Sequence, residues 1–154
     1  MRRDLSIGAL VCTIALASAA FAQAQYGTAA EAKAMLEKAI AAVKTDKDKA
    51  LAMFNKGEGG FKDRDLQPFC FNISDGKILA STNPNIVALG TDVRTLKDKS
   101  GKVFGAMVYD AAQQDKITET GTYVFPRPGQ TDPTTKVSFV SRIGDIGCGV
   151  GYFK

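Results

Sequence analysis

The sequence predicts an α+β domain in which a long N-terminal helix packs against a five-stranded antiparallel sheet. Residues 32–43 carry apolar side chains at helical spacing, and from residue 66 onward the pattern changes to short apolar runs separated by turn residues. With 154 residues, 45% of them hydrophobic and 23% charged, the chain has the size and composition of one soluble globular domain.

The first 22 residues have the features of a cleavable signal peptide. Arg2 and Arg3 precede an apolar run over residues 5–22, which ends in the small-x-small pattern Ala-Phe-Ala that signal peptidase accepts. We expect residues 1–22 to be removed and residues 23–154 to form a single exported domain. An uncleaved membrane anchor is the alternative, because the run approaches the length of about 20 residues that spans a bilayer.

The helical region that follows begins with a capping box. The Thr28 hydroxyl can accept from a free backbone N–H, and Glu31 can reach back to the cap. One apolar face then extends to Val43, and a second apolar patch beyond a charged stretch predicts another helix, capped by Thr45 with Asp48. Glycines at positions 57, 59 and 60 end this region.

Turn residues separate the five expected strands. Residues 66–72 and 77–81 should form a hairpin around Asp75-Gly76, a dipeptide typical of tight turns. Residues 85–100 should form a loop with short helical turns, and the apolar spacing after Gly101 predicts a helix. The remaining strands are expected at residues 121–125, 136–142 and 146–153. The last of them is rich in glycine, which permits the close approach of another group.

Two cysteines, Cys70 and Cys148, lie beyond the leader. An even pair in an exported chain is compatible with one disulfide, because the compartment is oxidising. Two buried thiols that pack as small hydrophobic groups are the alternative.

The composition excludes many catalytic classes. The chain has no histidine, so neither Ser-His-Asp nor Cys-His catalysis nor a histidine-ligated metal is possible. Acidic pairs such as Asp63 and Asp65 lie in polar stretches, whereas catalytic carboxylates need enclosure to separate their pKa values. We therefore expect a protein that is not an enzyme and needs no cofactor or metal. The net charge of +4 does not indicate a nucleic-acid partner.

The order of these signals resembles the single Cache domain family, second subtype, in its short secreted form. The resemblance covers residues 29–154 and rests on motifs at residues 61–66, 75–80, 83–84, 90, 96–102, 121–126, 136–145 and 147–152. It implies a PAS-like sheet in the order 2-1-5-4-3, with the long helix behind it and a small pocket between the sheet and residues 83–114. In that order the strands of Cys70 and Cys148 are neighbours, which permits a bridge.

The resemblance also implies a function. Such domains bind small carboxylates such as acetate, propionate, pyruvate or lactate in the periplasm, and act in signal transduction or chemotaxis through a membrane receptor or histidine kinase. Family members often carry histidine where this chain has Ser81 and Thr82, and an aromatic residue where it has Gln67, so the ligand stays open. A structural or adaptor module that binds no ligand is the alternative function.

A carboxylate site needs a cation or several N–H and O–H donors in a mostly apolar cavity. Side chains alternate along strands, so Tyr123 and Phe125 share one face, as do Lys136 and Ser138 on the next strand. We expect Lys136 to supply the charge, Tyr123 a hydroxyl donor and Phe125 a wall. Further donors are expected from Ser81, Thr82 and Asn83. The alternatives are a solvated lysine, plain core or surface aromatic residues, and polar residues that only cap a turn.

Overall fold

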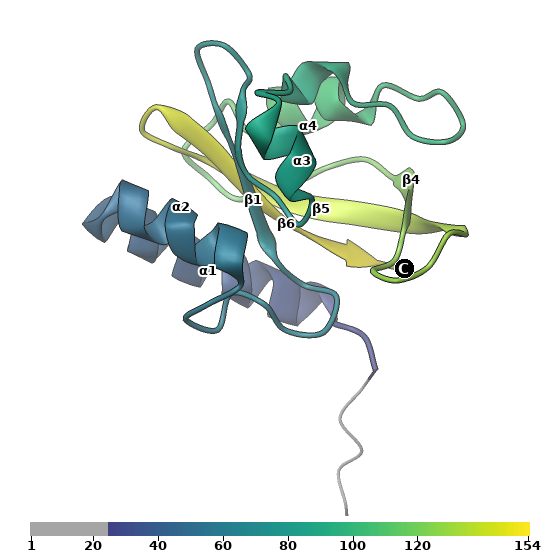
Figure 1. Cartoon of the computed structure of the whole chain (residues 1–154), viewed down its shortest axis with the longest axis horizontal. Coiled ribbons are helices and arrows are strands. Elements are labelled where there is room, and N and C mark those ends of the chain that lie inside the picture. The colour runs from purple at the N-terminus through teal and green to yellow at the C-terminus, as the bar shows by residue number, and fades with distance from the viewer. Residues whose placement is uncertain (1–24) are drawn as a thin grey trace, which may run out of the picture.

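The computed structural model describes residues 25–154, so the signal peptide predicted for residues 1–22 lies outside the described residues. An antiparallel sheet forms the centre, and helices cover both of its faces (Figure 1). One face carries α1 (Ala29–Thr45) and α2 (Lys47–Lys56). The other carries α3 (Pro84–Ala88), the short 3-10 helix η1 (Val93–Thr95) and α4 (Phe104–Ala111). This is the expected α+β arrangement.

Within residues 25–154 the sheet has six strands, in the order β2-β1-β6-β5-β3, with β4 also paired to β5. Their bounds are β1 Pro68–Asn72, β2 Ile78–Ala80, β3 Thr118–Glu119, β4 Tyr123–Pro126, β5 Pro133–Ile143 and β6 Ile146–Phe153. The prediction of five strands is wrong by one, because two short strands, β3 and β4, take the place of the single strand expected at residues 121–125.

Thr120 explains why the expected strand is divided into β3 and β4. Its backbone N–H donates to the Ser138 carbonyl at 2.8 Å, and its hydroxyl accepts from the Ser138 N–H at 3.0 Å. The side chain thus replaces a backbone partner, and the chain leaves the ladder before it pairs again from Tyr123. With β3 and β4 counted as one interrupted strand, the order matches the 2-1-5-4-3 sheet that the resemblance implied.

The N-terminal helices follow their capping signals with one correction. The Thr28 hydroxyl accepts from the Glu31 N–H at 3.3 Å, and Glu31 accepts from the Thr28 N–H at 2.8 Å, as the capping box requires. Asp46, not Thr45, caps α2, with its carboxylate accepting from Lys49 N–H at 3.0 Å. Asp46 has the extended backbone of an N-cap, whereas Thr45 is still the last residue of α1.

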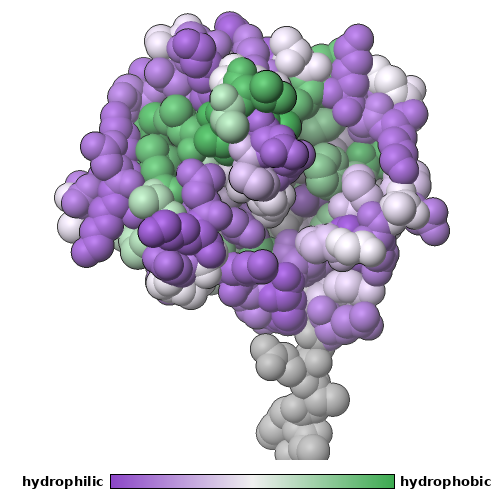
Figure 2. Space-filling view, in the orientation of Figure 1, coloured by the Kyte–Doolittle hydropathy of each residue, from purple (hydrophilic) through white to green (hydrophobic). Residues whose placement is uncertain are grey.

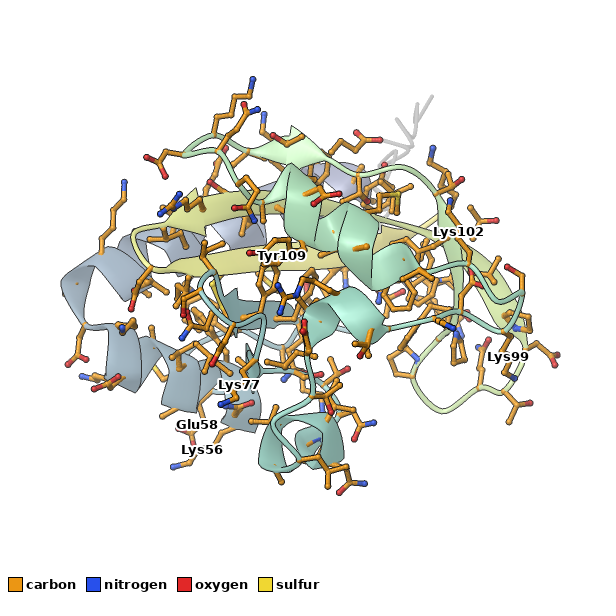
Figure 3. All side chains as sticks on the ribbon, turned by 90° about the horizontal axis from the view of Figure 1, so that it is seen from above. Lys56, Glu58, Lys77, Lys99, Lys102 and Tyr109 are labelled. Atoms are coloured by element: carbon orange, nitrogen blue, oxygen red, sulfur yellow. A yellow bond between two sulfur atoms is a disulfide. The ribbon has the colours of Figure 1, made fainter. Side chains whose placement is uncertain are left out.

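The layer formed by α3, η1 and α4 leaves hydrophobic side chains at the surface. Leu89, at the end of α3, is 81% exposed, and hydrophobic residues are visible in this part of the molecule (Figure 2). Seen from above, α4 lies over the sheet, with Tyr109 between them (Figure 3). The Tyr109 hydroxyl donates to the Ile73 carbonyl at 2.6 Å and so fastens α4 to the end of β1.

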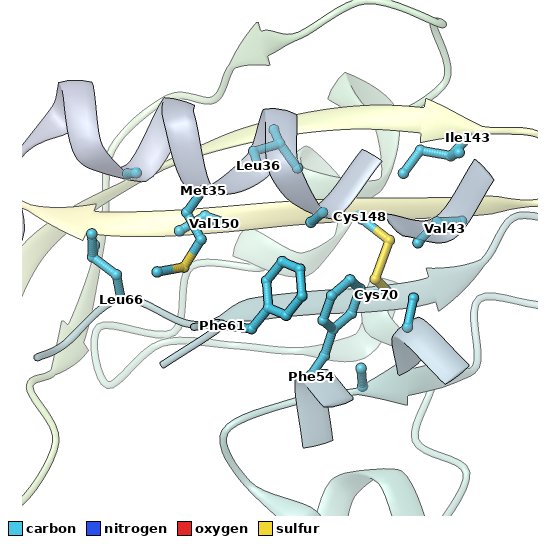
Figure 4. Packing of buried hydrophobic residues seen from close by; sticks show 14 of the residues in the cluster. Met35, Leu36, Val43, Phe54, Phe61, Leu66, Cys70, Ile143, Cys148 and Val150 are labelled. Atoms are coloured by element: carbon cyan, nitrogen blue, oxygen red, sulfur yellow. A yellow bond between two sulfur atoms is a disulfide. The ribbon is translucent and has the colours of Figure 1, made fainter. Parts of the chain in front are cut away.

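The core between α1, α2 and the sheet contains the disulfide. Cys70 on β1 and Cys148 on β6 are directly paired residues with a Cα–Cα distance of 4.1 Å, and their sulfurs are bonded (Figure 4). Of the two alternatives left open for these cysteines, the structure has the bridge. Phe54 and Leu36 pack in the same cluster and are fully buried.

On the face of β6 opposite Cys148, the strand has glycine residues instead of side chains. A Cβ atom would lie 2.7 Å from the Phe71 ring at Gly147 and 2.5 Å from Phe69 Cζ at Gly149. Because these positions lack side chains, the two phenylalanines of β1 lie close against β6. This is the close approach that the glycine-rich strand predicted, and it shapes the floor under α4.

Candidate ligand-binding site

A cavity of about 210 Å³ lies between the sheet and the segment that contains α3, η1 and α4. This is where the resemblance placed a pocket. Strands β1, β2, β4, β5 and β6 contribute its floor, and the residues after β2 form part of its rim. The walls are mostly hydrocarbon, and among the described residues no aspartate or glutamate lines the cavity. Such a cavity disfavours a cationic ligand and leaves room for an anionic one.

The structure brings six of the seven predicted site residues together around this cavity. They are Ser81, Thr82, Asn83, Tyr123, Phe125 and Lys136. Ser138 is fully buried and does not line the cavity, but its hydroxyl lies 2.8 Å from the Tyr123 hydroxyl. Its position is therefore behind Tyr123 rather than in contact with the cavity.

Lys136 is the central charged group. Its ammonium lies 5.0 Å from the ring centre of Phe125 and 4.6 Å from that of Phe153. Within residues 25–154 it has neither a hydrogen bond nor an ion pair, yet its nitrogen is not sealed from solvent. Desolvation lowers the pKa of Lys136 to about 8, while Asp65 acts in the opposite direction. The ammonium is thus mostly charged at neutral pH and open to an anionic partner.

The carboxylate whose charge opposes the lowered pKa of Lys136 is already paired. Asp65 pairs with Arg127 at 2.8 Å, and both side chains are largely buried. The other Asp65 oxygen accepts from the Gly27 N–H at 2.7 Å. Arg127 also stacks on Phe153, at 4.5 Å from its ring centre, so that Phe153 lies against both cations. Arg127 consequently satisfies Asp65, and Lys136 is left without a counter-ion.

Tyr123 supplies a neutral hydroxyl beside this cation. Its ring stacks on Phe104 with centres 4.5 Å apart, and Phe104 also meets Phe125 edge-on at 6.1 Å. Burial raises the pKa of Tyr123 to about 12, so the phenol is protonated at neutral pH. Either hydroxyl of the Tyr123–Ser138 pair can be the donor, and when Ser138 donates, the phenolic proton can be donated into the cavity.

Two of the three residues after β2 mainly serve the local backbone. The Ser81 hydroxyl accepts from the Asn83 N–H at 3.1 Å, and the side-chain Oδ1 of Asn83 accepts from the Asn85 N–H at 3.0 Å to cap α3. Both residues therefore have the turn-capping contacts that the sequence left as an alternative. Thr82 is exposed and lines the rim.

Two lining residues were not predicted as ligand donors. Lys97, on the loop before α4, is an exposed cation at the rim, and Gln67 lines the floor while its amide donates to the Phe54 carbonyl at 2.6 Å. The neighbouring lysines are used differently, since Lys99 and Lys102 donate to the carbonyls of Thr131 and Thr122 (Figure 3). All three lysines alternate with polar residues in one charged stretch, so the sequence offers no signal that separates Lys97 from the others.

Two further features of the described residues concern metals and membranes. Among residues 25–154, no group of three or more His, Cys, Asp or Glu side chains is placed to hold a metal ion. The same part of the chain has no helix that is both long and apolar enough to cross a membrane.

Comparison with known proteins supports the fold. No family model matches the sequence. No curated protein matches it either. A methyl-accepting chemotaxis protein from Vibrio parahaemolyticus matches over 80% of this chain and 86% of its own, with a TM-score of 0.63 and 20% identity. The chain has a Cache-type fold.

Two other solved structures have a similar fold. A periplasmic sensor domain of a chemotaxis protein matches with a TM-score of 0.58 and 20% identity, covering 79% of this chain and 87% of that one. A Cache chemosensory domain, described in terms of carboxylic acid recognition, matches with a TM-score of 0.57 and 18% identity, covering 79% and 85%. At these identities the similarity concerns the Cache-type fold alone.

Proposed function

We propose that this protein is a periplasmic sensor domain that binds a small organic carboxylate and passes its bound state to a membrane partner. In this proposal it is a single Cache domain of the second subtype, without enzymatic activity. The observation that carries it is Lys136, an ammonium that has no counter-ion among residues 25–154 and lies in a mostly apolar cavity that none of the acidic side chains in this range lines.

The chemistry of the site favours a carboxylate. A charge-assisted hydrogen bond from Lys136 would replace the hydration that the ammonium has lost, and it is stronger than a bond between neutral groups. The Tyr123 hydroxyl offers a second donor, and Phe125 closes the side of the cation. A neutral ligand would leave the buried charge uncompensated, and a cationic ligand would be repelled by Lys136 and Lys97.

The biological setting follows from the leader sequence and the fold. The predicted signal peptide over residues 1–22 supports export to the periplasm. Chemotaxis sensor domains share the fold, and one of them is described as recognising carboxylic acids, which supports an organic carboxylate as the ligand. A receptor or a histidine kinase in the membrane is the proposed partner.

A thermal-shift and calorimetry screen of the exported protein tests this function. Organic acids and their uncharged amides are compared at millimolar concentration, and we expect acids but not amides to raise the melting temperature. Lys136→Met should lose about tenfold or more in affinity, because it removes a charge-assisted hydrogen bond. Lys77→Met removes an exposed lysine outside the cavity and should bind like the wild type.

Two outcomes would overturn the proposal. If no acid raises the melting temperature, the domain does not sense carboxylates and the adaptor function is favoured. If Lys136→Met and the wild type bind an acid equally well, the cation assignment is wrong.

A further inference from the structure

We infer that the ligand is a carboxylate of about six to eight carbon atoms in total, with a larger apolar body than acetate or lactate has. This inference rests on the proposed function and specifies the ligand of the same site. It follows from how the charged and apolar parts of the cavity are placed across the sheet.

The cavity crosses several strands. Lys136 lies on β5 and Ile78 on β2, and both line the cavity. In the sheet β1 and β6 lie between these strands. Neighbouring strands are about 4.8 Å apart, so the two backbones are separated by roughly 14 Å. A group bound at Lys136 therefore occupies only one end of the space.

The end remote from Lys136 is apolar. Ile78 on β2 and Val93 on η1 are buried and line the cavity at this end, since the Val93 N–H donates to the carbonyl of Gly76 just before β2. Val108 of α4 also lines the cavity. Ile86 adds a half-buried side chain from α3. The polar residues near this end include Ser81 and Asn83, whose side-chain oxygens each accept from a backbone N–H. What this end offers a ligand is mostly hydrocarbon.

The volume agrees with a body of that size. A dry apolar cavity of about 150 Å³ is large enough for benzene, and this cavity measures about 210 Å³. A two-carbon or three-carbon acid held by Lys136 would leave the apolar end unfilled and lose the dispersion contacts of its walls. The stacked rings of Phe104 and Tyr123, with Phe125 edge-on, provide a wall suited to a flat or extended apolar body.

Calorimetry with a series of acids tests the inference. Acetate, propionate, butyrate, hexanoate, benzoate and phenylacetate are titrated into the exported protein, with hexanamide as the uncharged control. Each additional methylene buried up to hexanoate should increase affinity about fourfold, and benzoate should bind at least as tightly as hexanoate. Hexanamide should bind much more weakly than hexanoate. Acetate binding as tightly as hexanoate overturns the size inference but leaves the proposed function standing, whereas no binding by any acid overturns both.

A substitution at the apolar end tests whether this part of the cavity holds the apolar body of the ligand. Ile86→Phe places more bulk on the wall from α3, and we expect it to weaken hexanoate and benzoate about tenfold and acetate less than twofold. Leu89→Phe is the matched control, because Leu89 is 81% exposed and does not line the cavity. Val108→Ile adds one methylene from the rigid wall of α4 and should shorten the preferred chain. Equal effects of these variants on acetate and hexanoate would contradict the inference.

Discussion

The side chain of Lys136 lies across Gly151 of the neighbouring strand. A Cβ atom at Gly151 would be 2.4 Å from Lys136 Cε and 3.3 Å from its ammonium nitrogen. Ser138, which pairs with Gly151 in the ladder, would also be met by that Cβ, at 2.9 Å from its hydroxyl oxygen. The bare backbone of β6 is thus what allows the cation to lie on the floor of the cavity.

We expect Gly151→Ala to displace Lys136 and to weaken carboxylate binding by about tenfold, because the ammonium would lose its place beside Tyr123. Overpacking should also cost about 1–3 kcal/mol of unfolding free energy. Calorimetry and urea denaturation measure the two effects. Gly147→Ala is the control, since its Cβ would meet Phe71 rather than Lys136 and should reduce stability alone. Equal losses of affinity in both variants would argue against a specific role of Gly151.

Carboxylate binding should depend on pH through Lys136. Desolvation lowers its pKa to about 8, so raising the pH through this value removes the charge from the free domain and weakens binding. Near pH 8 the ligand should also draw a proton onto Lys136, because a bound anion stabilises the charged form. Calorimetry between pH 6.5 and 9.5 in buffers of different ionisation enthalpy measures both effects. Binding to Lys136→Met should be weak and flat over this range, whereas a pH profile equal to that of the wild type would contradict the assignment.

The stability of the ligand-free domain should rise with pH in the alkaline range. The pKa of Lys136 is about 8 in the folded protein against an ordinary value of 10.5. Between these values the unfolded chain binds more protons than the folded one, so the free energy of unfolding increases with pH. The cost of the buried charge is complete below pH 8 and disappears above about pH 10.5. Urea denaturation of the wild type and Lys136→Met, compared at pH 7 and 10, should therefore show a larger increase for the wild type.

Loss of the disulfide should destabilise the domain by about 2–4 kcal/mol, because the bridge closes a long loop in the unfolded chain. Cys70 and Cys148 are separated by 78 positions in the sequence. The double variant Cys70→Ala/Cys148→Ala is compared with the wild type by urea denaturation, with and without a reducing agent. Reduction should lower the stability of the wild type and leave the double variant unchanged. A wild type that is insensitive to reduction would show that the bridge contributes little.

Much of the fold follows from local sequence signals. The capping box at Thr28 and Glu31 and the Asp75-Gly76 turn act over a few residues, so the sequence locates the helix start and the first hairpin. The predictions that were wrong, the cap of α2 and the number of strands, depend on which of several nearby groups makes a contact. Thr45 and Asp46 are both competent caps, and the backbone geometry at the end of α1 selects Asp46. Thr120 interrupts a strand because a partner on β5 is within reach of its side chain.

By itself the sequence determines that the domain is α+β, that its two cysteines form an even pair, and that Tyr123 and Phe125 share one face of a strand, because periodicity and pair counting need no long-range contacts. Only the tertiary structure decides that Lys136 has no counter-ion among the residues it describes. Asp65 is far from both Lys136 and Arg127 in sequence, and the packing around Phe153 and Gly27 assigns it to Arg127. Whether a charge is paired depends on which groups folding brings within a few ångströms, and residue type alone does not contain that information.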